Sequence, residues 1–173
     1  MKTKILFYIE LPPPVHGMTY INKIIYDGLK SDEKYHFHNV DFSSEVSDIG
    51  KRGLSKVWQN IKLAFGAWKS FFKIMPTQVY SIVSASMFGI VRDFLILIPS
   101  VVFSKKRILH LHGFTYYDIY QNSKLYRVLF DILVSNSKLI VLCEAQKEKT
   151  KFIMKKDSIV LYNVLQNDVI FVM

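Results

Sequence analysis

The sequence has few of the features that would cross-link the chain, direct its export or anchor it in a membrane. It holds a single cysteine, Cys143, so no disulfide can form within it, and this usage suits a reducing compartment. The apolar run at residues 5–9 is too short for the core of a signal peptide. The run at 94–103 is interrupted by Pro99 and falls short of the roughly 20 residues that span a bilayer. We therefore expect a protein that stays in the cytosol.

Several nucleotide-binding and nucleic-acid-binding signatures are also missing. The sequence has no G-x-G-x-x-G and no G-K-[ST], which excludes a dinucleotide fingerprint and a P-loop. No recognised nucleic-acid-binding motif occurs, so nucleic acid is not an expected partner. Acidic residues are outnumbered, with 23 Lys and Arg against 14 Asp and Glu and a net charge of +9. This excess favours an anionic partner such as a membrane surface or a phosphorylated substrate, or it serves solubility alone.

Apolar runs with strand and helix periodicity alternate along the chain. Strands are expected near residues 4–9, 34–41, 78–83, 107–111, 138–142 and 158–162, and helices near 18–29, 54–74, 87–103, 124–134 and 144–154. This alternation predicts an α/β domain, a doubly wound and mainly parallel sheet with helices on both faces. We expect one Rossmann-like domain over residues 1–163, with 164–173 as the start of a linker or a truncated tail.

Ligands of such sheets bind at the carboxyl ends of the strands, so the segments that follow strands are the candidate sites. After the first strand come three prolines and then His16, Gly17 and Met18. A glycine at a helix start allows a backbone N–H to approach an anion, which makes these three residues candidate substrate contacts. The alternative is a stiff turn whose glycine only begins a helix.

The fourth expected strand ends in His110-Leu111-His112-Gly113. Both histidines should point to one face, with His112 at the strand end and His110 deeper in the core. His112 is our candidate catalytic residue, and Gly113 a candidate substrate contact. Zinc is disfavoured because no third ligand with suitable spacing lies nearby, and His16, His36 and His38 are discounted as ligands too. Cys143 fits a small core residue better than a nucleophile.

Four segments together resemble a known family. They are the first strand with its proline-rich, glycine-ended loop, then RILHLHG at 107–113, LIVLCE at 139–144 and IVLYNV at 159–164. In this order they resemble the N-terminal domain of group-one retaining glycosyltransferases with the GT-B fold. Two positions depart from the family pattern: His16-Gly17 stands where Gly-Gly is usual, and Cys143 where serine often precedes the glutamate.

The resemblance implies a function for a longer protein. Such an enzyme moves a sugar from a nucleotide-sugar donor to a saccharide acceptor, here a lipid-linked one in surface polysaccharide synthesis. The resemblance implies no cofactor beyond the donor, which a second domain absent from this sequence would bind, while this half holds the acceptor. We expect a cytoplasmic location, peripheral on the inner face of the membrane. The alternative is a non-catalytic truncated module, or a peripheral membrane partner, with the same fold.

The expected helix at 54–74 and the residues before it are basic and aromatic. Six cations and no acids lie between residues 51 and 73: Lys51, Arg52, Lys56, Lys62, Lys69 and Lys73. This pattern is typical of an interfacial membrane helix, but also of an amphipathic helix with a solvated lysine face. We expect Phe65, Trp68 and Phe72 to pack on the sheet, with the lysines, and in part Trp58, reaching an anionic membrane.

Overall fold

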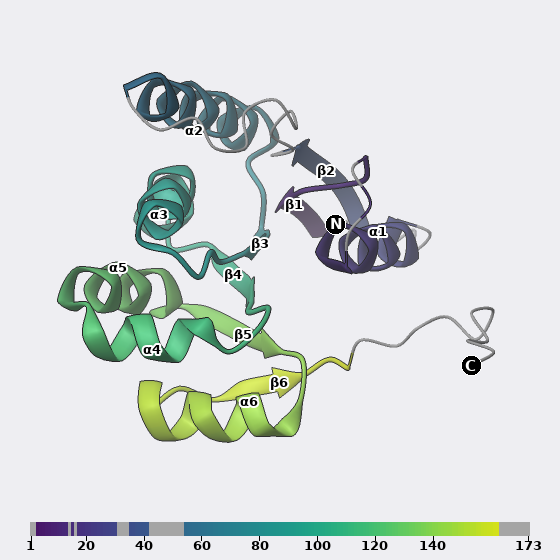
Figure 1. Ribbon diagram of the computed structural model, residues 1–173. Coiled ribbons are helices and arrows are strands. Elements are labelled where there is room, and N and C mark those ends of the chain that lie inside the picture. Colours follow the sequence, from purple (N-terminus) through teal and green to yellow (C-terminus); the bar gives the residue numbers. More distant parts are fainter. Residues whose placement is uncertain (1–2, 14, 16, 31–34, 42–53, 163–173) are drawn as a thin grey trace.

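The computed structural model describes residues 3–13, 15, 17–30, 35–41 and 54–162. All six strands pair in parallel in one sheet, in the order β2-β1-β3-β4-β5-β6 (Figure 1). The strands are β1 (Thr3–Ile9), β2 (Tyr35–Asp41), β3 (Gln78–Ile82), β4 (Lys106–His110), β5 (Ser137–Val141) and β6 (Ser158–Val160). The helices are α1 (Gly17–Lys30), α2 (Leu54–Ile74), α3 (Met87–Val102), α4 (Thr115–Asn122), α5 (Lys124–Val134) and α6 (Glu144–Lys149), which continues as a π-helical segment, Thr150–Met154.

The predicted α/β alternation is confirmed, with one helix added. Helix α4 lies where the sequence pattern predicts no element, and it buries Tyr116, Tyr117 and Tyr120. Tyrosine is a weak helix former, so local preference gave little sign of this helix. The structure describes nothing beyond residue 162, so the predicted tail at 164–173 lies outside the described residues.

The two faces of the sheet are covered by different helices. In Figure 1, α1 lies on one side, while α2 to α6 lie on the other. Side chains alternate along β1, and so Leu6 and Tyr8 pack in the larger core while Ile5 and Phe7 pack in the smaller core against α1. Helices on both faces make this a doubly wound, Rossmann-like α/β domain, as predicted.

The strand order reverses direction between β1 and β3. The chain leaves β1 through α1 to reach β2 on one side, and then passes through α2 to β3 on the other side of β1. Parallel crossovers keep a right-handed sense, so this reversal places α1 and α2 on opposite faces. The carboxyl ends of β1 and β3 therefore diverge at a topological switch point, where ligands of open α/β sheets bind.

The orientation of α2 corrects one prediction. Ala64, Ala67 and Phe71 face the core, and the indole of Trp68 donates a hydrogen bond to the Leu95 carbonyl at 2.8 Å. Phe65 is 62% exposed and Phe72 is 49% exposed, so the expectation that both pack on the sheet is wrong. The two alanines explain the difference, because small side chains let the helix lie close to its neighbours and turn the large aromatic rings outward.

Candidate functional site at the switch point

A cleft of about 310 Å³ opens at the carboxyl ends of β1 and β3. Its apolar lining includes Met18 of α1 and Ala85, which follows β3. Its polar lining comes from six separate segments, and includes Glu10, Asn22, Ser84, Arg92, His112 and Tyr116. The cleft thus occupies the position that the topology assigns to a ligand.

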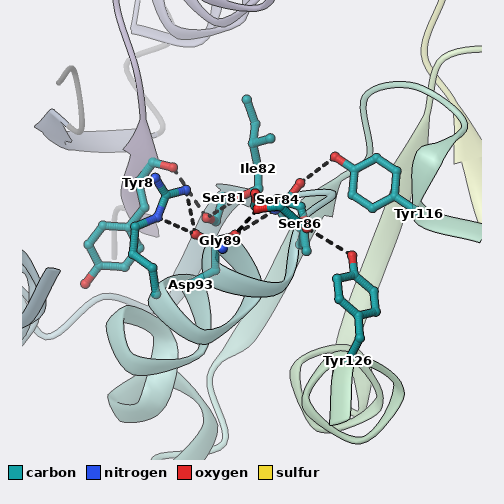
Figure 2. A network of polar contacts seen from close by, with 11 residues as sticks. Tyr8, Ser81, Ile82, Ser84, Ser86, Gly89, Asp93, Tyr116 and Tyr126 are labelled. Atoms are coloured by element: carbon teal, nitrogen blue, oxygen red, sulfur yellow. Dashed lines mark hydrogen bonds and ion pairs between the residues drawn. The ribbon is translucent and has the colours of Figure 1, made fainter. Parts of the chain in front are cut away.

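The loop after β3 is fixed by buried side chains from three helices. The backbone N–H of Ser84 donates to Asp93 Oδ2 at 2.6 Å, and the Ser84 carbonyl accepts from the Tyr126 hydroxyl at 2.9 Å. The Tyr116 hydroxyl donates to the carbonyl of Val83. Figure 2 shows both tyrosine hydroxyls pointing toward this segment. One wall of the cleft is therefore held in place by hydrogen bonds from within the protein.

Close packing at the start of α3 supports the same loop. Ser86 caps the helix, its Oγ accepting from the Gly89 N–H at 3.0 Å. A Cβ on Gly89 would lie 1.9 Å from Ser84 Oγ and 2.3 Å from Ser84 Cβ. Glycine is thus required at position 89 for the loop to approach the helix (Figure 2).

Arg92 is the cationic group of the cleft, and Asp93 holds it. Arg92 Nε and Nη2 lie 2.9 Å and 2.8 Å from Asp93 Oδ1. Burial raises the pKa of the Asp93 carboxyl, while the charge of Arg92 and the hydrogen bonds from Arg92 and Ser84 oppose that rise. Nη1 of Arg92 makes no hydrogen bond to the described residues, which leaves it available to a ligand.

His112 enters the cleft from the segment after β4. Its backbone N–H donates to the Tyr116 hydroxyl at 3.2 Å, and its ring centroid lies 4.1 Å from that of His110. Burial lowers the pKa of His112 to about 4, so its imidazole is neutral near pH 7. Its Nε2 is buried and has no hydrogen-bond partner in the described structure.

His110 lies deeper, as predicted, and both histidines lie on the same face of the sheet. His110 is fully buried, and its Nδ1 lies 2.7 Å from the hydroxyl of Tyr80. Burial, with a smaller effect of His112, lowers the pKa of His110 to about 3. His110 therefore acts as a neutral core residue that supports the ring of His112.

Asn22 supplies a second unsatisfied polar atom. It is fully buried on α1, and its Nδ2 donates to the Glu10 carbonyl at 2.9 Å, which ties the helix to the end of β1. Its Oδ1 has no hydrogen-bond partner among the described residues. A buried acceptor without a partner costs roughly 1–3 kcal/mol, which a donor from a ligand would recover.

The sequence-predicted site residues divide into two groups. Met18 and His112 line the cleft. Gly17 and Gly113 do not line the cleft. Gly17 is the exposed first residue of α1. Gly113 has a φ of 95°, and its carbonyl accepts a hydrogen bond from Gln146 Nε2 at 2.6 Å. His16 lies outside the described residues.

Sequence reasoning missed Glu10, Asn22, Ser84 and Arg92. Glu10 and Ser84 come almost directly after expected strands, and the rule that ligands bind at strand ends could have found them. Asn22 and Arg92 lie inside helices, where nothing in the local sequence separates a cleft residue from a solvated one.

The predicted lysine set on and before α2 is only partly described. Lys62, Lys69 and Lys73 are exposed. Lys51, Arg52 and the side chain of Lys56 lie outside the described residues. Within the described part of the chain, no group of three or more His, Cys, Asp or Glu side chains could hold a metal ion.

The fold is a Rossmann-like α/β domain with a cleft at its switch point. No helix in the described ranges is long and apolar enough to cross a membrane. Comparison with protein-family models, with curated proteins and with solved structures gives no match.

Proposed function

We propose that the switch-point cleft binds a saccharide acceptor and that the chain is the acceptor-binding half of a glycosyltransferase. The observation that carries this proposal is the convergence of unsatisfied polar groups at the switch point. Asn22 Oδ1 and His112 Nε2 have no partners among the described residues, and both side chains line one cleft. Hydroxyl groups of a sugar both donate and accept, so they can satisfy either atom.

The balance of charge in the cleft favours a polyhydroxylated ligand over a bare anion. Arg92 is the one cationic side chain among the described lining residues, and it is paired with Asp93, while Glu10 adds a carboxylate. Arg92 Nη1 can donate to sugar oxygens. Met18 and Ala85 offer apolar surface to the C–H groups of a sugar ring.

The reaction class comes from the motif order, in which His112-Gly113 follows the fourth strand as in group-one retaining glycosyltransferases. In that chemistry an acceptor hydroxyl oxygen bonds to the anomeric carbon, the bond from that carbon to the nucleotide phosphate breaks, and the hydroxyl proton is released. His112, neutral near pH 7, would contact the reacting sugar. A donor-binding domain would complete the site from the open side of the cleft.

A lipid-linked acceptor and a peripheral position on the inner face of the membrane belong to the same proposal. The support is the exposure of Lys62, Lys69 and Lys73 on α2, a helix without acidic residues. Cations near an anionic bilayer surface each contribute about 1 kcal/mol to binding at low salt. A lipid-linked substrate would reach the cleft most readily from a protein held at that surface.

Ligand-observed NMR tests the saccharide site directly. The purified chain is mixed with a panel of methyl glycosides, disaccharides and nucleotide sugars, and saturation transfer to each is measured. We expect signals from saccharides with the parent chain, reduced severalfold in His112→Ala and unchanged in Asn122→Ala, an exposed position at the end of α4. Equal signals from the parent and His112→Ala, or none from any saccharide, would refute the acceptor site.

Transfer itself is a separate test. We expect no turnover of a nucleotide sugar by the 173-residue chain alone, because the donor-binding half would come from a further domain. Turnover above a no-protein control would contradict the assignment of donor binding to a further domain. Saccharide binding without transfer, even when the chain is joined to a donor-binding domain, would favour a non-catalytic module.

A further inference from the structure

Three large aromatic side chains on α2 point away from the core. Trp58 is 59% exposed, and Phe65 and Phe72 follow at intervals of seven residues with exposures of 62% and 49%. A spacing of seven places them on one face of a helix. That face is turned away from the buried Ala67 and Phe71, so it lies on the solvent side of α2.

Lysines share this face with the aromatic rings. Lys62 and Lys69 follow Trp58 and Phe65 by four residues each, and the Lys62 ammonium lies 5.7 Å from the centre of the Trp58 ring. Lys73 is exposed at the C-terminal end of the same helix. Helix α2 contains no acidic residue, so the face carries charge of one sign only.

The apolar surface continues onto the end of α3. The ring of Phe103 lies 5.7 Å from that of Phe72, edge to face, and is itself 49% exposed. Val102, next to Phe103 in the chain, and Met75, directly after α2, are 68% and 49% exposed. Clustered apolar side chains of this size on a protein surface are typical of an interaction site. Trp68 is not part of this exposed stripe, because its indole N–H is bound to the Leu95 carbonyl.

We propose that this face of α2 lies in the interface of an anionic lipid bilayer, with Trp58, Phe65 and Phe72 inserted among the upper acyl chains. The lysines would then contact the headgroup phosphates, their alkyl stems lying along the aromatic rings. Positive charges without acidic neighbours on the helix, beside exposed aromatic rings, match the charge and polarity profile of that interface. The inference rests on the peripheral membrane position in the proposed function and deepens it, and its test is separate from that of the saccharide site.

Vesicle co-sedimentation tests the proposal on the whole chain. The probes are vesicles of phosphatidylcholine alone and of phosphatidylcholine with phosphatidylglycerol, at low and high salt. We expect binding to the anionic vesicles that weakens with salt but persists in part. The triple variant Trp58→Ser, Phe65→Ser, Phe72→Ser should lose the salt-resistant part, with at least tenfold weaker binding. Absence of binding by the parent, or an unchanged triple variant, would overturn the proposal.

Matched controls separate the stripe from general hydrophobicity and charge. Phe88→Ser with Phe152→Ser removes two more exposed rings, 87% and 77% exposed, from other elements, and should bind like the parent. The variant Lys62→Glu, Lys69→Glu, Lys73→Glu should lose binding at low salt. The same charge change at three exposed lysines outside α2, namely Lys124, Lys138 and Lys151, should have a smaller effect. An equal loss of vesicle binding in both lysine variants would show that binding depends on overall charge and not on this face of α2, which would contradict the proposal.

Fluorescence and oligomeric state complete the test. In a Trp68→Phe background the emission reports Trp58 alone, and it should shift to the blue on adding anionic vesicles. An unshifted emission with the vesicles bound would place Trp58 outside the bilayer and contradict insertion.

The oligomeric state tests the other occupant of this face. If sedimentation velocity shows a dimer that the aromatic triple variant dissociates, and the chain binds no vesicles, the face joins two copies of the chain and the membrane proposal is wrong. Saccharide binding that persists without vesicle binding would overturn this proposal and leave the acceptor site intact.

Discussion

The side-chain carboxylate of Asp93 accepts a hydrogen bond from the backbone N–H of Ser84 at 2.6 Å, across the loop between β3 and α3. The same carboxylate binds Arg92, whose guanidinium lines the cleft. One buried acid thus fixes both the loop and the basic side chain of the site. A change at this acid should therefore disturb the stability of the fold and the shape of the cleft together.

Asp93→Asn should destabilise the fold by about 3 kcal/mol, because an amide cannot accept from Ser84 and Arg92 together and leaves the guanidinium without its counter-charge. Urea unfolding measures the loss. Asp157→Asn, at an exposed position, is the control and should change stability by less than about 0.5 kcal/mol. Similar effects of the two substitutions would show that Asp93 does not hold the loop.

Two glycines should respond in opposite directions to alanine. In Gly89→Ala the new Cβ would meet Ser84 Oγ at 1.9 Å, so we expect a loss of about 1–3 kcal/mol from overpacking. A Cβ added to Gly66, inside α2, would meet no atom within 4 Å, and Gly66→Ala should gain up to about 1 kcal/mol from helix propensity. Thermal unfolding of the pair is the measurement. A neutral Gly89→Ala would mean that the loop can move away at no cost.

Tyr116→Phe should cost about 1–2 kcal/mol, since it removes the donor to the Val83 carbonyl and the acceptor of the His112 N–H. The loss should also reposition His112, which NMR shifts of its ring protons would report. Tyr162→Phe, at an exposed position, should leave both stability and those shifts in place. Unmoved His112 signals in Tyr116→Phe would show that the bridge does not position the ring.

Stability should decrease as the pH falls from about 6.5 to 5. Burial holds the pKa values of His110 and His112 at about 3 and about 4, below their ordinary 6.5, so the unfolded chain takes up protons first. Each histidine contributes at most about 1.4 kcal/mol per pH unit in that window. Urea unfolding at several pH values should give a shallower dependence for His110→Gln and His112→Gln. A dependence as steep as that of the parent would contradict neutral burial of the two rings.

The amino-acid sequence determined the class of the fold, because alternating strand and helix patterns are local. Residues 4–9 and 107–111 read as buried strands from their apolar, β-branched content, and the helices between them from their spacing. The same local reading placed His112 beyond a strand end and His110 in the core. It missed α4, whose tyrosines carry little helix preference.

The tertiary structure alone decided which residues share the cleft and which face of α2 is outside. Asn22, Arg92 and His112 converge because β1 lies between β2 and β3, and long-range strand order is not encoded in any short segment. Helix α2 has two apolar stripes, one of alanines with Phe71 and one of Trp58, Phe65 and Phe72. Both have helical spacing, and only the fit of small side chains against the neighbouring elements selects the alanine face for the core.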